Sequence, residues 1–196
     1  MTRTRTRKFP AAGLLVVVAA IAVGLGYQSL ASSLPTAASP LHGAGAGAGS
    51  GEAGGALPRG TTVFDDDVPG VANLDPALLA ALRAAAAEAA RDGVRFYVDS
   101  GWRSRAYQER LFREAVARYG SVEAAARWVA TPGRSAHVSG DAVDIAPAAA
   151  AWLSVHGAAY GLCQIYANES WHYELRPEAA DHGCPPMYAD ASRGPT

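Results

Sequence analysis

The chain has 196 residues, of which 49% are hydrophobic and 18% are charged, so it can hold one folded domain with appendages. Four of its 17 basic residues precede residue 9, and the other 13 stand against 18 acidic residues, a net charge of −5 for the remainder. This acidic balance disfavours nucleic acid as a partner, because binding to phosphates requires a basic surface.

An uncharged apolar run lies near the start of the chain, between residues 9 and 27. About 20 such residues can cross the hydrocarbon core of a membrane as a helix. Because the basic residues precede the run, the positive-inside rule keeps residues 1–8 in the cytoplasm and sends the rest of the chain out. We therefore predict a transmembrane anchor or signal peptide at 9–30, with small residues at 31–33 as a possible cleavage site.

Alanine, glycine, serine and proline dominate residues 31–61. Such a composition buries too little apolar surface to offset the entropy lost on ordering, so we expect a flexible linker there. The folded domain is then expected at 62–196, outside the cytoplasmic membrane and held to it by the N-terminal helix, or secreted if that helix is cleaved. We expect this domain to act as a monomer.

Helix signals dominate the first half of the domain. Asp75 is a good N-cap before proline, and the Ala/Leu-rich stretch that follows runs to Arg91 before a glycine. Ser104 caps a second helix over 105–119, and Ser121 caps a third, short one that reaches Val129.

Strand signals gather in the second half. Residues 94–98 alternate and are rich in β-branched and aromatic side chains, and 142–145, 162–166 and 171–175 are further strand candidates, with a helix over 148–156. Because most strands follow the helices, we predict an α+β fold with a small antiparallel sheet flanked by helices.

The domain has two cysteines, Cys163 and Cys184. In an oxidising compartment they are expected to form one disulfide that closes a loop across the C-terminal segment. The alternative is a pair of buried thiols.

Two clusters carry the residue types of a metal centre. The first, Ser-Ala-His-Val-Ser-Gly-Asp-Ala-Val-Asp, spans 135–144, and the second, Glu-Ser-Trp-His-Tyr-Glu, spans 169–174. A catalytic zinc site needs three His, Asp or Glu ligands and one open position, and His137, Asp144 and His172 fit those three places. The glycine at 140 allows the sharp turn that such convergence requires.

Glu169 is the candidate general base, because it lies three residues before a proposed ligand and zinc lowers the pKa of bound water towards about 7. Glu174 shares a strand face with His172 and is the competitor, which we expect to be a hydrogen-bond partner of the ligand instead. Of the other histidines, His156 is expected to be structural at a helix end, and His182 is a reserve ligand.

The motifs Ser-x-His-x-x-Gly-x-Ala-x-Asp and Glu-x-Trp-His resemble the signature of the VanY-type D-alanyl-D-alanine carboxypeptidases. That zinc peptidase family also includes the VanX-type D,D-dipeptidases. An upstream match, Ser-Gly-Trp-Arg-Ser at 100–104 with Gln108 beyond it, is similar to the family's Tyr-Arg-Ser-x-x-x-Gln, apart from Trp102 where tyrosine is common. The resemblance covers most of residues 70–190.

The resemblance implies a fold shared with the Hedgehog signalling domain, one zinc ion at the three ligands and Glu169 as the base. It also implies that Arg103 polarises the scissile carbonyl, which is sensible because a fixed cation stabilises developing negative charge. Ser135 and Gln108 become candidates for binding the substrate's terminal residue. Trp171 is a further candidate, unless it packs in the core.

The implied activity is removal of the terminal D-alanine from peptidoglycan stem peptides or precursors that end in D-Ala-D-Ala. Alternatives in the same family are an L,D-carboxypeptidase or a wall endopeptidase. A different class, a zinc-stabilised binding module without turnover, would have no need for a carboxylate at 169.

Overall fold

The computed structural model describes residues 51–194. The expected anchor at 9–30 lies outside this range, as do the basic segment and most of the expected linker. Within the described range, no helix has both the length and the hydropathy of a membrane span. The helices and strands, in chain order, are η1 Glu52–Gly54, α1 Pro69–Ala72, α2 Pro76–Ala89, η2 Ala90–Asp92, β1 Val98–Ser100, α3 Arg105–Tyr119, α4 Val122–Ala126, α5 Ala136–Ser139, β2 Ala142–Ile145, α6 Pro147–His156, η3 Gly157–Tyr160, β3 Leu162–Gln164, β4 His172–Leu175 and α7 Ala179–His182.

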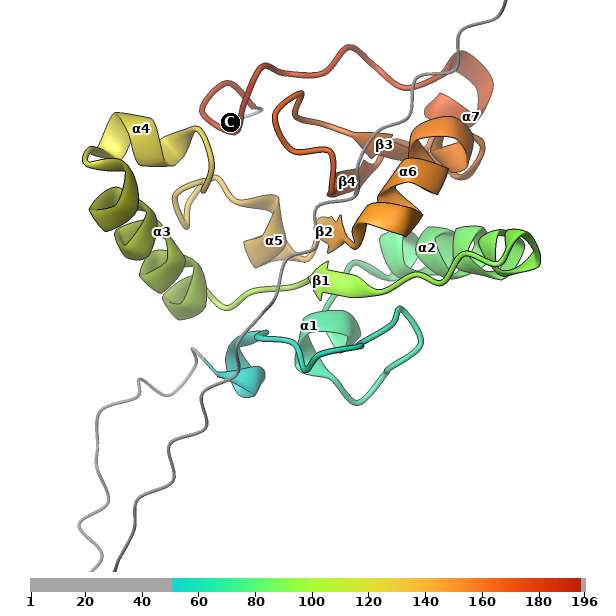
Figure 1. The fold of residues 1–196 in the computed structure, drawn as a ribbon, viewed down its shortest axis with the longest axis horizontal. Helices are drawn as coiled ribbons and strands as arrows, with labels where there is room; N and C mark the ends of the chain where they lie inside the picture. Colours follow the sequence, from blue (N-terminus) through green and yellow to red (C-terminus); the bar gives the residue numbers. More distant parts are fainter. Residues whose placement is uncertain (1–50, 195–196) are drawn as a thin grey trace, which may run out of the picture. The chain divides into compact units, whose positions relative to one another are not determined.

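The strands form one antiparallel sheet in the order β1-β2-β4-β3. The two central strands are β2 and β4, and their register pairs Asp144 with His172 across the ladder. In Figure 1, helices α2 and α6 lie on the right of the view, and α3 and α4 lie on the left. The predicted α+β class with a small antiparallel sheet is confirmed.

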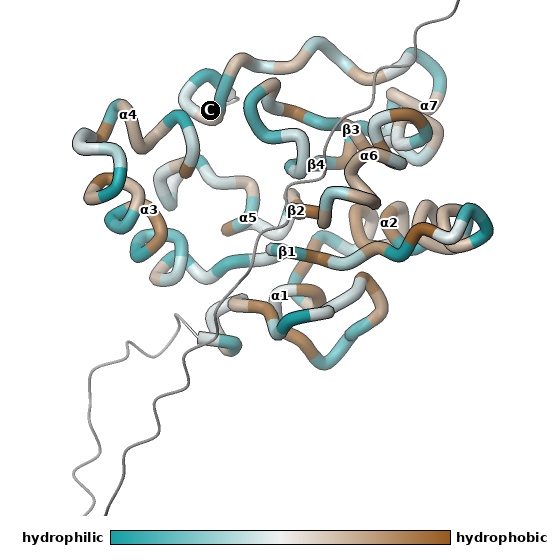
Figure 2. Tube along the Cα trace, viewed as in Figure 1, coloured by the Kyte–Doolittle hydropathy of each residue, from teal (hydrophilic) through white to brown (hydrophobic). Residues whose placement is uncertain are grey.

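The main core lies between α2, α6 and the sheet. The Asp75 carboxylate accepts hydrogen bonds from two backbone N–H groups of α2, as expected of an N-cap, and the helix then buries Leu78 and Leu82 completely. These leucines pack with Val143, Ile145 and other fully or nearly fully buried apolar residues. Figure 2 shows apolar residues concentrated along α2, whereas α3 alternates between polar and apolar positions.

Part of the segment before residue 62, where a linker was expected, packs against the domain. Gly54 and Gly55 are buried, and the Ser104 amide donates to the Gly54 carbonyl at 2.8 Å. A Cβ at Gly55 would lie 2.1 Å from the Trp102 carbonyl oxygen. Glycine is therefore required there for close backbone contact, and it need not indicate a flexible chain.

The strand expected at 94–98 is shifted. Its alternation is real, since Phe96 and Val98 are buried and Tyr97 is exposed, but the ladder with β2 involves only 98–100. Tyr97 instead forms an isolated bridge with Thr62. The alternating pattern predicted the extended backbone correctly, and the position of the partner strand decided where the ladder begins.

Cys163 and Cys184 form the expected disulfide. It joins β3 to the segment after α7, and the chain then runs back beside the β3–β4 connection, where the Tyr188 amide donates to the Ile165 carbonyl at 2.9 Å. At the far end of this C-terminal segment, Arg134 donates to the Gly194 carbonyl at 2.9 Å. The C-terminal segment is thus tied to β3 by the disulfide, to the β3–β4 connection by Tyr188 and to the loop before α5 by Arg134.

We predict that Gly140→Ala destabilises the fold by about 2–4 kcal/mol, because Gly140 has a φ of +85° and a Cβ there would lie 2.5 Å from the Asn73 carbonyl oxygen. Denaturant unfolding would measure the loss. Gly133→Ala is the matched control, since a Cβ at Gly133 meets nothing within 4 Å. Equal stability of the two variants would contradict the constraint at Gly140.

Candidate metal centre and catalytic pocket

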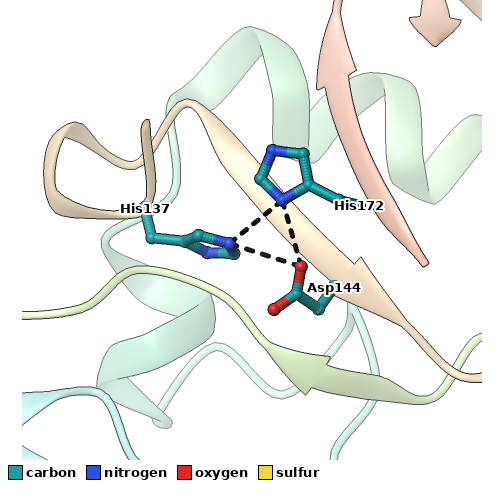
Figure 3. A group of neighbouring side chains, drawn as sticks. All are labelled: His137, Asp144 and His172. Atoms are coloured by element: carbon teal, nitrogen blue, oxygen red, sulfur yellow. Dashed lines mark hydrogen bonds and ion pairs between the residues drawn. The ribbon is translucent and has the colours of Figure 1, made fainter. Parts of the chain in front are cut away.

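Three side chains from three elements converge at one end of the central strands. His137 comes from α5, Asp144 from β2 and His172 from the start of β4 (Figure 3). The pairing of β2 with β4 sets the last two opposite each other. Gly140, in the left-handed conformation at the C-terminus of α5, reverses the chain so that His137 faces the strand that follows it.

The donor atoms of these side chains form a nearly equilateral triangle. His137 Nε2 and His172 Nδ1 are 3.3 Å apart, and they lie 3.3 Å and 3.1 Å from Asp144 Oδ1. Ligands about 2.0–2.1 Å from a tetrahedral ion lie about 3.3 Å from one another, so the triangle has the size of one face of a zinc coordination tetrahedron. All three residues are buried.

The outer nitrogen of each imidazole has a partner that accepts hydrogen bonds. His137 Nδ1 donates to the Gly101 carbonyl at 2.8 Å, and His172 Nε2 donates to Glu174 Oε1 at 3.2 Å. In the neutral rings the inner nitrogens are therefore acceptors, and they point at each other and at the Asp144 carboxylate. Three converging lone pairs repel unless a cation lies among them, so these residues fit a metal ion.

Two ion pairs in series hold the His172 ring on the side away from the other two donors: Glu174 contacts His172, and Arg176 contacts Glu174. Arg176 donates to Glu174 Oε2 at 2.7 Å, and Glu174 in turn bonds the ring, the contact expected for this glutamate. Burial alone would raise the pKa of Glu174, but the hydrogen bonds with His172 and Arg176 outweigh it and hold the pKa below the usual value. Burial alone would lower the pKa of His172, yet the bonds with Asp144 and Glu174 raise it to about 9. The centre therefore favours positive charge at this ring, which a divalent cation would also supply.

Arg103 supports Asp144. Its guanidinium donates to Asp144 Oδ2 at 2.6 Å, to Gln108 Oε1 at 3.1 Å and to Ser100 Oγ at 2.7 Å, so the side chain is fixed along its length. Burial alone would raise the pKa of Asp144, but His137, His172 and Arg103 together hold it well below the usual range. Asp144 is thus ionised at neutral pH, as a carboxylate ligand must be.

Glu169 lies in the β3–β4 connection, is 6% exposed, and lines the same pocket as the three donors. Its Oε1 is buried and has no hydrogen-bond partner among the described residues. Burial raises its pKa to about 7. A buried carboxylate oxygen without a donor needs an external one, and a water molecule beside a metal ion is a chemically suitable donor.

The pocket has a volume of about 330 Å³, and the other predicted residues line it. Ser135 is buried at the N-terminus of α5, and Trp171 is 39% exposed and therefore does not pack in the core. Gln108 also has hydrogen bonds within the protein: its amide accepts from Arg103 and donates to the Ala130 carbonyl at 2.8 Å. These bonds hold Arg103 in place, so Gln108 is first of all a positioning residue.

The remaining histidines lie away from the donor triangle. His156 stacks on Trp152 with ring centroids 4.4 Å apart, which agrees with the structural role expected of it. His182, the reserve ligand, is exposed and does not belong to the cluster of possible metal donors in the described residues. The reserve assignment is therefore wrong.

Sequence reasoning missed Arg176 and Tyr166. Arg176 follows Glu174 by two residues, so the strand period that links His172 to Glu174 would also have pointed to it. The Tyr166 ring lies 5.0 Å from that of His172 and lines the pocket, and burial raises the pKa of its hydroxyl to about 12. No sequence signal distinguished this tyrosine from an ordinary core residue.

Comparison with known proteins identifies the family. The family model described as VanY, D-alanyl-D-alanine carboxypeptidase, matches residues 71–178, more than half of the chain. The chain belongs to the VanY family. The resemblance inferred from the motifs is thereby confirmed, and membership in a family of peptidoglycan carboxypeptidases supports a hydrolase. No curated protein matches the chain significantly.

Several solved VanY-like structures are similar to this chain. VanYB in complex with D-alanine-D-alanine is 30% identical, covers 55% of this chain and 74% of its own, and gives a TM-score of 0.50. A mutant of the D,D-pentapeptidase VanY from a VanB-type resistance cassette, in complex with Zn(II), is 30% identical. It covers 52% of this chain and 72% of its own, with a TM-score of 0.48. The LdcB LD-carboxypeptidase is 29% identical and covers 57% of this chain and 70% of its own, with a TM-score of 0.49.

We predict that His137→Ala abolishes stoichiometric zinc binding, because it removes one of three ligands and leaves an incomplete donor set. Zinc content after dialysis, measured by atomic emission, checks this. His182→Ala is the matched control and should retain zinc, since that histidine is exposed. Full zinc occupancy in His137→Ala would exclude His137 as a ligand.

Proposed function

We propose that this chain is a zinc-dependent D,D-carboxypeptidase that removes the terminal D-alanine from peptidoglycan stem peptides. The observation that supports it most is the convergence of three acceptor atoms beside a buried, unpartnered Glu169 oxygen in a VanY-family pocket. VanYB, the relative with the TM-score of 0.50, was solved with D-alanine-D-alanine, which supports a substrate with that ending.

His137, Asp144 and His172 would hold the metal ion. Two imidazoles and a carboxylate in a small buried triangle suit zinc, and a VanY relative was solved with Zn(II). When bound there, zinc supplies Lewis acidity and lowers the pKa of a water molecule. Glu174 and Gly101 keep both rings in the tautomer that directs a lone pair at the ion.

Glu169 is the proton carrier in this proposal. Its carboxylate takes a proton from the attacking water, and the water oxygen forms a bond to the carbonyl carbon of the scissile peptide. The carbon–nitrogen bond then breaks as Glu169 passes the proton to the leaving amine. Arg103 is fixed by three hydrogen bonds in the same pocket, where its positive charge stabilises the negative charge that develops on the carbonyl oxygen.

We also propose that the domain works outside the cytoplasmic membrane, held by the apolar run at 9–30. The basic residues before that run support this orientation. The disulfide between Cys163 and Cys184 supports an oxidising compartment. A tether of a few tens of residues would let the domain reach stem peptides in the wall.

We expect the zinc-loaded protein to release one D-alanine from an acylated peptide ending in Lys-D-Ala-D-Ala, and a chelator to stop the release. Free D-alanine is measured by a coupled oxidase assay. A peptide ending in Lys-D-Ala is run in parallel. Release of D-alanine only from that shorter peptide would show that the protein is an L,D-carboxypeptidase and not a D,D-carboxypeptidase. No release from any peptide by folded, zinc-loaded protein would support a binding module.

Glu169→Ala should retain zinc and lose activity by about 10²- to 10⁴-fold, because a positioned general base contributes that much. In the wild type, Glu169 must be ionised to act, so kcat/KM should fall as the pH is lowered through its pKa. Burial raises that pKa to about 7, and a bound dication lowers it, so the acid limb should lie between the ordinary 4.5 and about 7. A flat profile over this range would contradict Glu169 as the base.

A further inference from the structure

The catalytic pocket continues along one face of α3. Gln108, Leu111, Ala115 and Tyr119 recur at spacings of three and four residues, which places them in one stripe on the helix, and all four line the pocket with the metal donors. Gln108 stands at the metal end, because its amide accepts from Arg103, which bonds Asp144. The stripe therefore leads from the metal centre to the C-terminal end of α3.

The length of this groove exceeds what a dipeptide needs. Gln108 and Tyr119 are eleven residues apart, and a helix rises about 1.5 Å per residue, so the stripe is about 16 Å long. An extended peptide advances about 3.3 Å per residue, so about four or five residues would fill the groove. A carboxypeptidase has a single residue on the leaving side of the bond, so only the acyl side of a substrate can supply them.

Aromatic rings and a cation form the far end of the groove. Tyr119 stacks on Trp128, with ring centroids 6.1 Å apart and an interplanar angle of 14°, and both rings are partly exposed. The Arg118 guanidinium lies 5.4 Å from the Tyr119 ring centroid. All three residues line the pocket.

The charge at this end is positive. Within residues 51–194, Arg118 has no ion pair with a carboxylate. The acidic residue of α3 that lines the groove, Glu114, is already paired with Arg110 at 2.8 Å on the same helix. An anionic group on the occupant would therefore meet a cation whose charge is not neutralised by the protein.

We propose that the α3 groove is an extended substrate subsite, in which Arg118 binds a free carboxylate of the peptide and Tyr119 and Trp128 pack against the peptide. The inference rests on the proposed carboxypeptidase function and deepens it. An arginine side chain is long and flexible, so its charge can meet a carboxylate on the outer residues of an extended peptide in the groove, from about the third residue before the scissile bond outward. In a wall stem peptide the third residue before that bond is the γ-linked D-glutamate, which carries a free α-carboxylate.

The test uses three substrates with the zinc-loaded full chain. The first is acyl-Lys-D-Ala-D-Ala, the second is acyl-L-Ala-γ-D-Glu-L-Lys-D-Ala-D-Ala, and the third is the same pentapeptide with the D-glutamate α-carboxylate amidated. We expect the acidic pentapeptide to be hydrolysed with a higher kcat/KM than both others. The advantage over the amidated peptide should be about threefold to tenfold, as expected of a partly exposed charged pair.

Arg118→Gln should bring the ratio between the acidic and the amidated pentapeptide to about one. Arg113→Gln is the matched control: Arg113 lies on the same helix, pairs with Glu109 and does not line the pocket, so its ratio should equal that of the wild type. Trp128→Ala should reduce the advantage of both pentapeptides over the short substrate, whatever the charge. Comparing Trp128→Ala with Arg118→Gln therefore separates the contribution of aromatic packing from that of charge recognition.

Equal kcat/KM for the three substrates in the wild type would overturn the subsite, as would an unchanged ratio in Arg118→Gln. Hydrolysis of none of them would instead be a failure of the proposed function. The groove is then tested by calorimetry, with Glu169→Ala and each pentapeptide. Tighter binding of the acidic than of the amidated peptide, lost in the additional variant Arg118→Gln, would support the subsite, and equal binding would overturn it.

Discussion

The pairing of β2 with β4 is the constraint on which the functional part of the molecule depends. It sets Asp144 opposite His172, and the left-handed turn at Gly140 adds His137 as the third donor. Because a ladder register can change only in whole residues, a slip would turn one donor to the other face of the sheet. The core beneath, formed by α2 and α6, therefore does more than stabilise the fold, since it fixes this register.

Ion pairs balance the buried negative charges in the same region. Each of two buried carboxylates has its own arginine: Arg103 for Asp144 and Arg176 for Glu174. Paired in this way, the carboxylates stay ionised and hold the donors in place, as ligand or as hydrogen-bond partner of a ligand. Glu169 differs, because burial without a partner raises its pKa. One pocket thus holds carboxylates with opposite pKa shifts, an arrangement suited to a division between ligand and proton carrier.

The two sides of the domain differ in what they contribute. On one side, α2 and α6 bury apolar residues against the sheet and provide the rigid support. On the other, α3 buries only Gln108 and Ala115 and leaves much of its apolar stripe to line the pocket. Apolar side chains that face a cavity instead of a core add little to the stability of the fold, which makes this helix a suitable place for substrate recognition to vary.

The sequence by itself determined the starts of the main helices, the antiparallel α+β class, the disulfide, and the candidate metal donors and Glu169, because caps, strand alternation and spaced motifs are local signals. It did not reveal what distant segments decide: the packing of residues 54 and 55 against the domain, the limits of β1, and the hydrogen bond that joins Gln108 to Arg103. The groove along α3 was also decided by the tertiary structure. These features depend on which surfaces meet across the fold, and no local pattern along the chain records that.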